Sequence, residues 1–417
     1  MGVFARAFLL LLAVPAQAES LTQGQIIAGS GAARHFVEIP RGTYVVLTAD
    51  VFNSSATISI KEAQGAEVAT LTPLTDLAGT SFVEFITMAG GTYEIAVTPA
   101  GSGPASVVYE VRVEEARAAK SGDDARVIAA KRVGNALTVL QQDPPDAKRL
   151  AEALRLVVGV CANDNERNVH ARTVAGALET AAPHFKEAEA QFRNALEQAA
   201  PGDSYRQAVL LNHLALVLSK LGRFPETLDA ATRAVPAADK SGSPYLQATA
   251  RSYVCAMLMQ AGRMSQAIAS CREAAAIAGE KQILAIGAET HVRLAQMLGL
   301  DGDPEADSYG RRAVEAFRTL KNSQGLAYAL TTLSDLCYRR GDPQCALNYA
   351  SADSGFASYR ITVRSGGEVV ATAGAKAQII QRRRVVSLVI PVAFSGRQVF
   401  ECAGQRNRGG SISGDSG

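Results

Sequence analysis

The chain has no tryptophan, few other aromatic residues and few histidines, and the spacing of its histidines and cysteines argues against a metal site. Aromatic residues make up 6% of it, and its five histidines are nowhere spaced as H-x-x-H or H-E-x-x-H. Those spacings bring two imidazoles to one metal ion. The six cysteines include no C-x-x-C pair, which argues against a thioredoxin-like motif or a zinc ribbon. We therefore expect no metal and no cofactor.

Nucleotide-binding and hydrolase signatures are missing as well. The sequence has neither the phosphate loop G-x-x-x-x-G-K-[ST] nor the nucleophile elbow G-x-S-x-G. Lys and Arg number 42 against 40 Asp and Glu, a formal net charge of +2. This balance suggests neither nucleic acid nor an anionic membrane surface as a partner. We expect a protein that is not an enzyme.

Residues 1–18 have the layout of a secretory signal peptide. Arg6 supplies the positive start, Ala7–Val14 is an apolar core too short to span a bilayer, and Ala16-Gln17-Ala18 is a small-x-small cleavage site. The alternative is an uncleaved N-terminal anchor. We expect cleavage near Ala18, no membrane span afterwards, and a secreted or periplasmic location.

Composition divides the rest of the chain into parts, since it is too long for a single core. Residues 24–115 are rich in Thr, Val, Gly and Tyr, in short runs separated by turn signals such as Gly90-Gly91. They predict an antiparallel β-sandwich. The Gly-Thr-Tyr starts at Gly42 and Gly91 resemble bacterial pre-peptidase C-terminal sandwiches, which implies an adhesive or shielding module. A stabilising cap without a ligand is the alternative.

Residues 123–350 are rich in Ala, Leu, Arg and Glu, and part of this region repeats. Gly222, Gly262 and Gly302 are spaced by 40 residues, and Gly341 follows 39 residues later. Apolar residues recur at helical spacing on both sides of each glycine. Over roughly residues 165–350 this pattern resembles the tetratricopeptide repeat (TPR) in a longer-period form, which implies an α-solenoid of about five helix pairs. A plain helical bundle is the alternative.

The order of the parts adds a second resemblance. A secreted sandwich, the phrase DDARVIAAKRVGNAL and a TPR array are similar to the N-terminal portion of bacterial secreted proteins that end in a CHAT domain, a caspase-like peptidase. Residues 351–417 are too few for that domain, and no histidine follows His291. The resemblance therefore implies no peptidase activity here. The chain could be a truncated or split portion of such a protein.

The C-terminal residues change character again. Residues 351–404 contain four strand-like runs and predict a small β module or a partial sandwich. Residues 405–417 are polar and glycine-rich, which is typical of a disordered tail. The whole sequence thus predicts a multidomain α and β protein.

Four cysteines stand where they could pair across a helical hairpin. Cys255 and Cys271 flank Gly262, and Cys337 and Cys345 flank Gly341. Possible disulfides therefore join Cys255 to Cys271 and Cys337 to Cys345. The alternative is that these cysteines are small apolar residues at the helix contacts.

The first helix of each repeat should line a concave groove. Some long-period TPR relatives carry an Asn before the first-helix Leu, which holds a peptide backbone, but that position varies here. The groove candidates are polar or aromatic, and they are Asn212, His213, Lys220, Tyr253, Arg293, Gln296, Asp335 and Arg339. This mixture suits a polar peptide with an acidic or C-terminal carboxylate group. A solvated helix face without a partner is the alternative.

The sequence therefore favours a secreted scaffold for protein–protein association through the groove. Two other hypotheses stay open. One is a portion of a CHAT-type peptidase system, which a peptidase domain in the next reading frame would indicate. The other is a surface adhesin that uses the sandwich.

Overall fold

The computed structural model describes residues 18–75, 77–101, 106–141, 145–163, 169–351, 361–365, 368–373 and 387–389. The predicted signal peptide up to Gln17 lies outside these residues. So do the last of the four strand-like runs in residues 351–404, which contains Cys402, and the predicted tail at 405–417.

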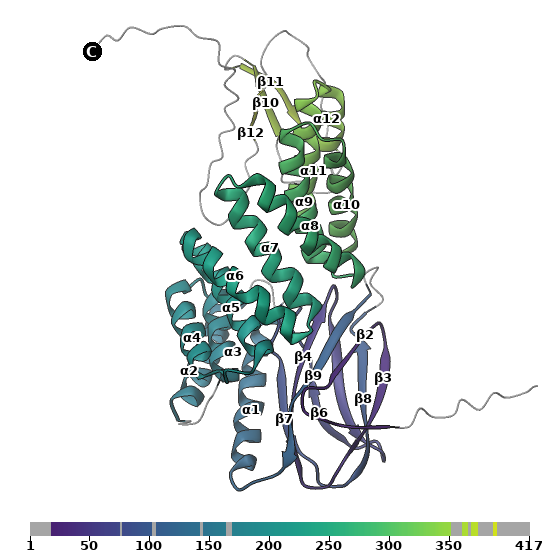
Figure 1. Ribbon diagram of the computed structural model, residues 1–417, viewed down its shortest axis with the longest axis vertical. Coiled ribbons are helices and arrows are strands. Elements are labelled where there is room, and N and C mark those ends of the chain that lie inside the picture. Colours follow the sequence, from purple (N-terminus) through teal and green to yellow (C-terminus); the bar gives the residue numbers. More distant parts are fainter. Residues whose placement is uncertain are drawn as a thin grey trace, which may run out of the picture.

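Nine strands form two sheets in the N-terminal part (Figure 1). The strands are β1 (Glu19–Ser20), β2 (Ile26–Ser30), β3 (Ala33–Ile39), β4 (Thr43–Phe52), β5 (Ala56–Glu62), β6 (Glu67–Leu71), β7 (Phe82–Ile86), β8 (Gly91–Pro99) and β9 (Val108–Ala118). One sheet has the order β1-β3-β8-β5-β6 and the other β2-β9-β4-β7. Neighbouring strands are antiparallel except for the short β1, which pairs parallel with β3.

The two sheets share a core, but β4 is buried on both faces. In β5 buried and partly buried residues alternate, as expected for a strand with one face on a core. Every residue of β4 is buried instead. One face contributes Val45, Leu47 and Val51 to the core between the sheets. The other face must therefore be covered from outside the sandwich, and helices cover it.

Twelve α-helices follow within the described residues, joined in the order α1 to α12. They are α1 (Asp123–Leu137), α2 (Ala147–Asn163), α3 (Val169–Ala181), α4 (Phe185–Gln198), α5 (Ser204–Lys220), α6 (Phe224–Ser241), α7 (Pro244–Gln260), α8 (Met264–Glu280), α9 (Leu284–Leu300), α10 (Glu305–Thr319), α11 (Ser323–Arg339) and α12 (Pro343–Ser351). A 3₁₀ turn, Thr138–Gln141, follows α1. From α3 onward the helices form five antiparallel pairs in a solenoid-like arrangement (Figure 1).

The repeated glycines end the first helix of each pair from α5 onward. Gly222, Gly262, Gly302 and Gly341 all have φ between 71° and 78°, a left-handed conformation that favours glycine. After Gly222, the Arg223 N–H donates to the Leu218 carbonyl at 3.0 Å and closes the helix end. Small residues at the contact between the two helices are buried. Examples are Ala188, Ala267 and Ala306.

The sandwich packs against the beginnings of the first helices. Phe52 and Ala78 share an apolar cluster with residues of α5 to α9, including Tyr205, Val209 and Tyr245. Leu74 and Phe82 share another cluster with α1, α2 and α3. Figure 1 shows the β4 side of the sandwich next to these helices. The sandwich and the helices therefore share buried surface and are not joined by a linker alone.

Three further strands are described in the C-terminal part: β10 (Ile361–Ser365), β11 (Glu368–Ala373) and β12 (Ser387–Val389). They form an antiparallel sheet in the order β11-β10-β12.

Two disulfides join the helices within a pair. Cys255 on α7 bonds to Cys271 on α8 with 5.2 Å between the Cα atoms. Cys337 on α11 bonds to Cys345 on α12 with a Cα separation of 5.6 Å. Both separations lie in the usual range for a disulfide.

Replacing Cys337 and Cys345 by serine is expected to lower the free energy of unfolding by about 2 kcal/mol, because the unfolded chain loses a closed loop. Urea denaturation under oxidising conditions measures the change. Dithiothreitol should destabilise the parent protein more than the variant, because the variant has no Cys337–Cys345 bond to lose. Equal stability of the two proteins without reductant would contradict the prediction.

Candidate groove and the docked sandwich

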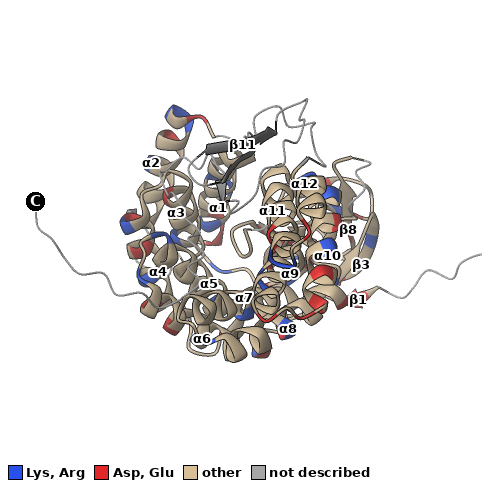
Figure 2. Cartoon of the chain, turned by 90° about the horizontal axis from the view of Figure 1, so that it is seen from above, with Lys and Arg blue, Asp and Glu red and all other residues tan. Residues whose placement is uncertain are grey.

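The first helices of the repeats line the inner side of a curved array. Seen from above, α3, α5, α7, α9 and α11 lie inside, and α4, α6, α8 and α10 lie outside (Figure 2). His213, Tyr253, Arg293 and Thr332 take matching places on α5, α7, α9 and α11, because the helices start 39 or 40 residues apart. The surroundings of these matching positions differ from one helix to the next.

On α5 the inner face is occupied by the chain's own sandwich. His213 is buried, and its Nε2 lies 3.0 Å from the carbonyl oxygen of Ala78. Its ring stacks on Phe192 at 5.1 Å between centroids. Burial lowers the pKa of His213, so the neutral ring is favoured. Asn212 is also buried, and its Nδ2 donates to the Leu246 carbonyl at 3.4 Å. Neither side chain is open to a partner.

The segment that covers the inner face of α5 is the connection between β6 and β7. Gly79 of this connection packs against the helix: a Cβ added there would lie 2.6 Å from Val209 Cγ1. Gly79 also has φ of +72°. Its N–H donates to Asp50 Oδ1 at 2.7 Å, and its carbonyl accepts from Arg206 Nη1 at 3.0 Å. Only glycine fits both the space and the backbone conformation.

A buried ion cluster holds this surface together. Arg206 on α5 is 2% exposed and pairs with Glu114 on β9. Thr48 donates to the same carboxylate, and His170 Nε2 on α3 lies 2.7 Å from it. Burial alone would raise the pKa of Glu114, but the charge of Arg206 and the contact with His170 outweigh it. The pKa of Glu114 is therefore held well below its usual range.

A second group of contacts extends the docked surface to α7 and α9. The Tyr205 hydroxyl donates to Asp50 Oδ2 at 2.5 Å. Phe52 stacks on Tyr245 of α7 with 4.2 Å between ring centroids. Asn53 donates to the Gln282 carbonyl at 2.7 Å and accepts from the Leu284 N–H at 2.9 Å. The sandwich therefore reaches the beginning of every first helix from α3 to α9.

Beyond the docked sandwich, the inner face of α7 and α9 is partly exposed. Tyr253 is half-buried. Burial and the nearby Glu289 raise its pKa, so the phenol stays protonated. Arg293 donates to Ser252 Oγ at 2.9 Å and pairs with Glu289 at 3.3 Å. Gln296 donates to the Tyr328 hydroxyl on α11 at 2.8 Å.

Several large or charged side chains of α5, α9 and α11 are exposed. Tyr328 is 52% exposed and Leu300 is 53% exposed. Asp335 and Arg339 on α11 are exposed and pair with each other at 2.6 Å. Lys220, at the end of α5, is exposed as well. The structure therefore places Tyr253, Arg293, Gln296, Asp335 and Arg339 on the open part of the face.

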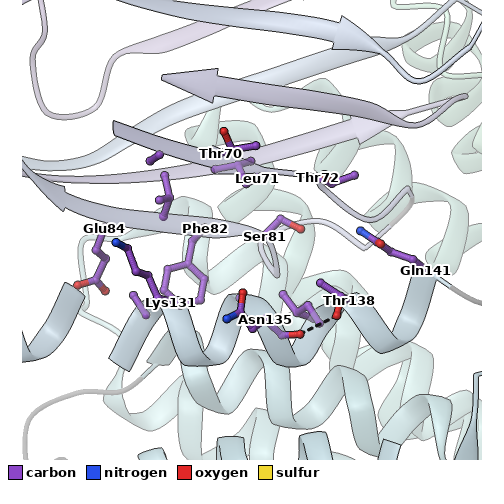
Figure 3. Close-up of a pocket in the computed structure, with 15 residues that line it drawn as sticks. Thr70, Leu71, Thr72, Ser81, Phe82, Glu84, Lys131, Asn135, Thr138 and Gln141 are labelled. Carbon is purple, nitrogen blue, oxygen red and sulfur yellow. Dashed lines mark hydrogen bonds between the residues drawn. The ribbon is translucent and has the colours of Figure 1, made fainter. Parts of the chain in front are cut away.

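A separate pocket of about 280 Å³ lies where β6, β7 and α1 meet (Figure 3). Lys131 and Asn135 of α1, with Thr138 of the 3₁₀ turn that follows it, face Thr70 and the β7 strand across the pocket. The pocket's buried carboxylate is already partnered, because Glu84 accepts from Tyr44 and lies 3.9 Å from Arg126. We assign no ligand to this pocket.

The described residues contain no group of three or more His, Cys, Asp or Glu side chains placed to hold a metal ion. In the same part of the chain, no helix combines the length and apolarity needed to cross a membrane.

No protein-family model matches the sequence, and no curated protein matches it. Several solved structures are similar to it. PilW, a type IV pilus biogenesis factor, is 17% identical, and the match covers 55% of this chain and 93% of PilW with a TM-score of 0.43. PilF of Pseudomonas aeruginosa is 15% identical, with coverages of 57% and 93% and a TM-score of 0.41.

A third match is a signal transduction ATPase with a tetratricopeptide repeat sensor from Pyrococcus horikoshii. It is 14% identical, and the match covers 56% of this chain and 37% of the ATPase with a TM-score of 0.46.

Proposed function

We propose that this chain is a scaffold that binds a protein or peptide partner along the open inner face of α7, α9 and α11. One observation carries the proposal. This face combines large exposed side chains, Tyr328 and Leu300, with amide and guanidinium groups that can form hydrogen bonds. Aromatic anchors beside adaptable polar groups are typical of surfaces that bind peptides.

The present partners of these polar groups can be exchanged for a ligand at little cost. The pairs Arg293–Glu289 and Arg339–Asp335 are partly exposed, and exposed ion pairs contribute only about 0–1 kcal/mol. Gln296 and Tyr328 satisfy each other and can turn to the amides of an extended backbone. An acidic group or a C-terminal carboxylate on the partner would compete with Glu289 for Arg293.

We further propose that the scaffold is not an enzyme and works outside the cytoplasm. The signal-peptide layout of residues 1–18 supports the location. The two disulfides support it as well, because disulfides persist in oxidising compartments.

A binding comparison with matched variants tests the groove. The oxidised full chain and the variant Tyr253→Ala/Arg293→Ala are each used to recover partners from a periplasmic extract. We expect at least one partner to be recovered about tenfold less with the variant, a loss of about 1.4 kcal/mol in binding free energy. Arg233→Ala on the outer helix α6 is the control and should recover the same partners as the parent protein. Equal recovery of every partner by all three proteins would remove the groove assignment.

A deletion of residues 19–115 would not test whether the chain is a surface adhesin that binds through the sandwich. That deletion would uncover the apolar cluster around Val209 and Tyr245 and leave Arg206 without Glu114. Loss of attachment after the deletion would therefore report damage to the helices. Substitutions on the outer surface of β3, such as Phe36→Ser, leave the docked surface intact and separate the two explanations.

A further inference from the structure

Two carboxyl groups face each other in the surface between the sandwich and the helices. Asp50 on β4 and Glu110 on β9 are direct partners in the antiparallel ladder. Partners in a ladder project from the same face of the sheet, with Cβ atoms about 5 Å apart. Both side chains are buried. Like charges directly opposite each other destabilise a sheet, so this pair is costly when both groups are ionised.

Each of the two carboxyl groups contacts a different helix. Asp50 accepts from the Tyr205 hydroxyl of α5 and from the Gly79 N–H. Glu110 accepts from the Ser243 hydroxyl and the Tyr245 N–H at the beginning of α7. The second oxygen of Glu110, Oε2, is buried without a hydrogen-bond partner. A proton on this pair would neutralise one charge without breaking the contacts to the helices.

The surrounding basic side chains have their contacts elsewhere. Arg112, two residues along β9 from Glu110, donates to the Ser241 carbonyl at 2.7 Å and lies over the Tyr205 ring. Arg206 on α5 pairs with Glu114, and His170 on α3 contacts the same carboxylate. On the other side of β9, β2 places Ala28 opposite Glu110. Among the described residues, no cation forms an ion pair with Asp50 or Glu110.

We propose that the Asp50–Glu110 pair is a proton-controlled latch, in which a bound proton keeps the sandwich docked on α5 and α7 and loss of that proton loosens the docking.

The direction of the pH effect follows from the burial of the pair. Burial raises the pKa of Asp50 to about 6. Burial and the facing Asp50 raise the pKa of Glu110 to about 7. The docked state therefore binds protons more tightly than the undocked state. The stabilisation of the docked state by these protons is complete below the ordinary carboxyl pKa. It is lost as the pH rises through about 6 and 7. His213 acts in the opposite direction, because burial lowers its pKa and protonation below its ordinary value opposes docking.

Undocking would uncover Arg206, Val209 and His213 on the inner face of α5. If the open face binds a partner as proposed above, the binding surface would then extend by one helix pair. The latch itself does not depend on that function, because it concerns contacts within one chain.

Hydrogen exchange of the full oxidised chain tests the latch without any partner. Amide exchange is followed at about pH 6 and about pH 8.5 and corrected for the intrinsic effect of pH. We expect segments 77–83 and 204–213 to exchange about tenfold faster at the higher pH, as for a shift of about one pKa unit. Helices α10 and α11, far from the docked surface, should show no such change.

Three variants decide the cause. Glu110→Gln and Asp50→Asn keep the shape of the pair and remove one titrating group each, so the pH effect should shrink to less than about threefold, half a pKa unit. Glu94→Gln, on the other sheet, should behave like the parent protein. The latch is overturned if the parent exchanges equally at both pH values, or if both Glu110→Gln and Asp50→Asn keep the full change. Because no partner takes part, this outcome is independent of the recovery of partners from the periplasmic extract.

Discussion

Replacing Arg206 by methionine is expected to lower the free energy of unfolding by about 3–5 kcal/mol, the cost of breaking a buried ion pair on one side. The guanidinium is 2% exposed and bonds both to Glu114 and to the Gly79 carbonyl. Methionine fills much of the same space but leaves the Glu114 carboxylate with His170 and Thr48 only. Urea denaturation followed by far-UV circular dichroism gives the change.

A second substitution and a surface control separate charge from packing. Adding Glu114→Gln to Arg206→Met removes the unpaired charge, so the double variant should be more stable than the sum of the two single losses by at least about 1 kcal/mol. Arg233→Met on α6 is the control. That side chain is 57% exposed and pairs with Asp229, so its loss should stay within about 0.5 kcal/mol. A loss below 1 kcal/mol for Arg206→Met would show that the cluster does not stabilise the docked surface.

The helix pairs could be predicted from the sequence because their signals are local. A glycine with positive φ every 39 or 40 residues ends each first helix from α5 to α11. Small residues such as Ala267 mark where the two helices touch. The strands could be predicted for the same reason, because turn residues and alternation fix their ends. The helix pairs and the two sheets of the described residues agree with the predicted helices and strands.

The docking of the sandwich could not be predicted, because its residues have no signal of their own. Asp50, Glu110 and Glu114 occupy strand positions that would serve equally well on a solvated face. Only the burial of all of β4 shows that this face is covered. Helical spacing consequently predicts His213 in a groove and gives no sign of Ala78, its contact 135 residues away. The charged residues within β4 and β9 were the available hint, since central strands rarely hold them without a reason.

The same limit divides the groove candidates. Tyr253, Arg293 and Gln296 lie on the open face, where the periodicity alone placed them. Asn212 and His213 satisfy the same periodicity but are covered. Helical spacing decides which side of the array a residue faces. Long-range docking decides whether that side is exposed, and it depends on contacts between residues more than 100 positions apart.

Replacing Gly79 by alanine is expected to lower the free energy of unfolding by about 3 kcal/mol, the sum of two effects. A residue with a Cβ in the left-handed region costs about 1 kcal/mol. The new methyl group would also lie 2.6 Å from Val209 Cγ1, and overpacking of a buried contact costs about 1–3 kcal/mol. Gly79 joins the sandwich to α5 through Asp50 and Arg206, so the methyl group would push apart the surfaces that those bonds hold together.

Gly65→Ala is the matched control, because Gly65 has φ of +84° and no atom near the added Cβ. It should show the backbone cost of about 1 kcal/mol alone. The difference between the two variants then measures the clash at the docked surface. Val209→Ala removes the obstructing methyl groups, so Gly79→Ala/Val209→Ala should be more stable than the sum of the single losses by about 1 kcal/mol or more. Equal losses for Gly79→Ala and Gly65→Ala, with strict additivity in the double variant, would mean that the connection between β6 and β7 does not press against α5.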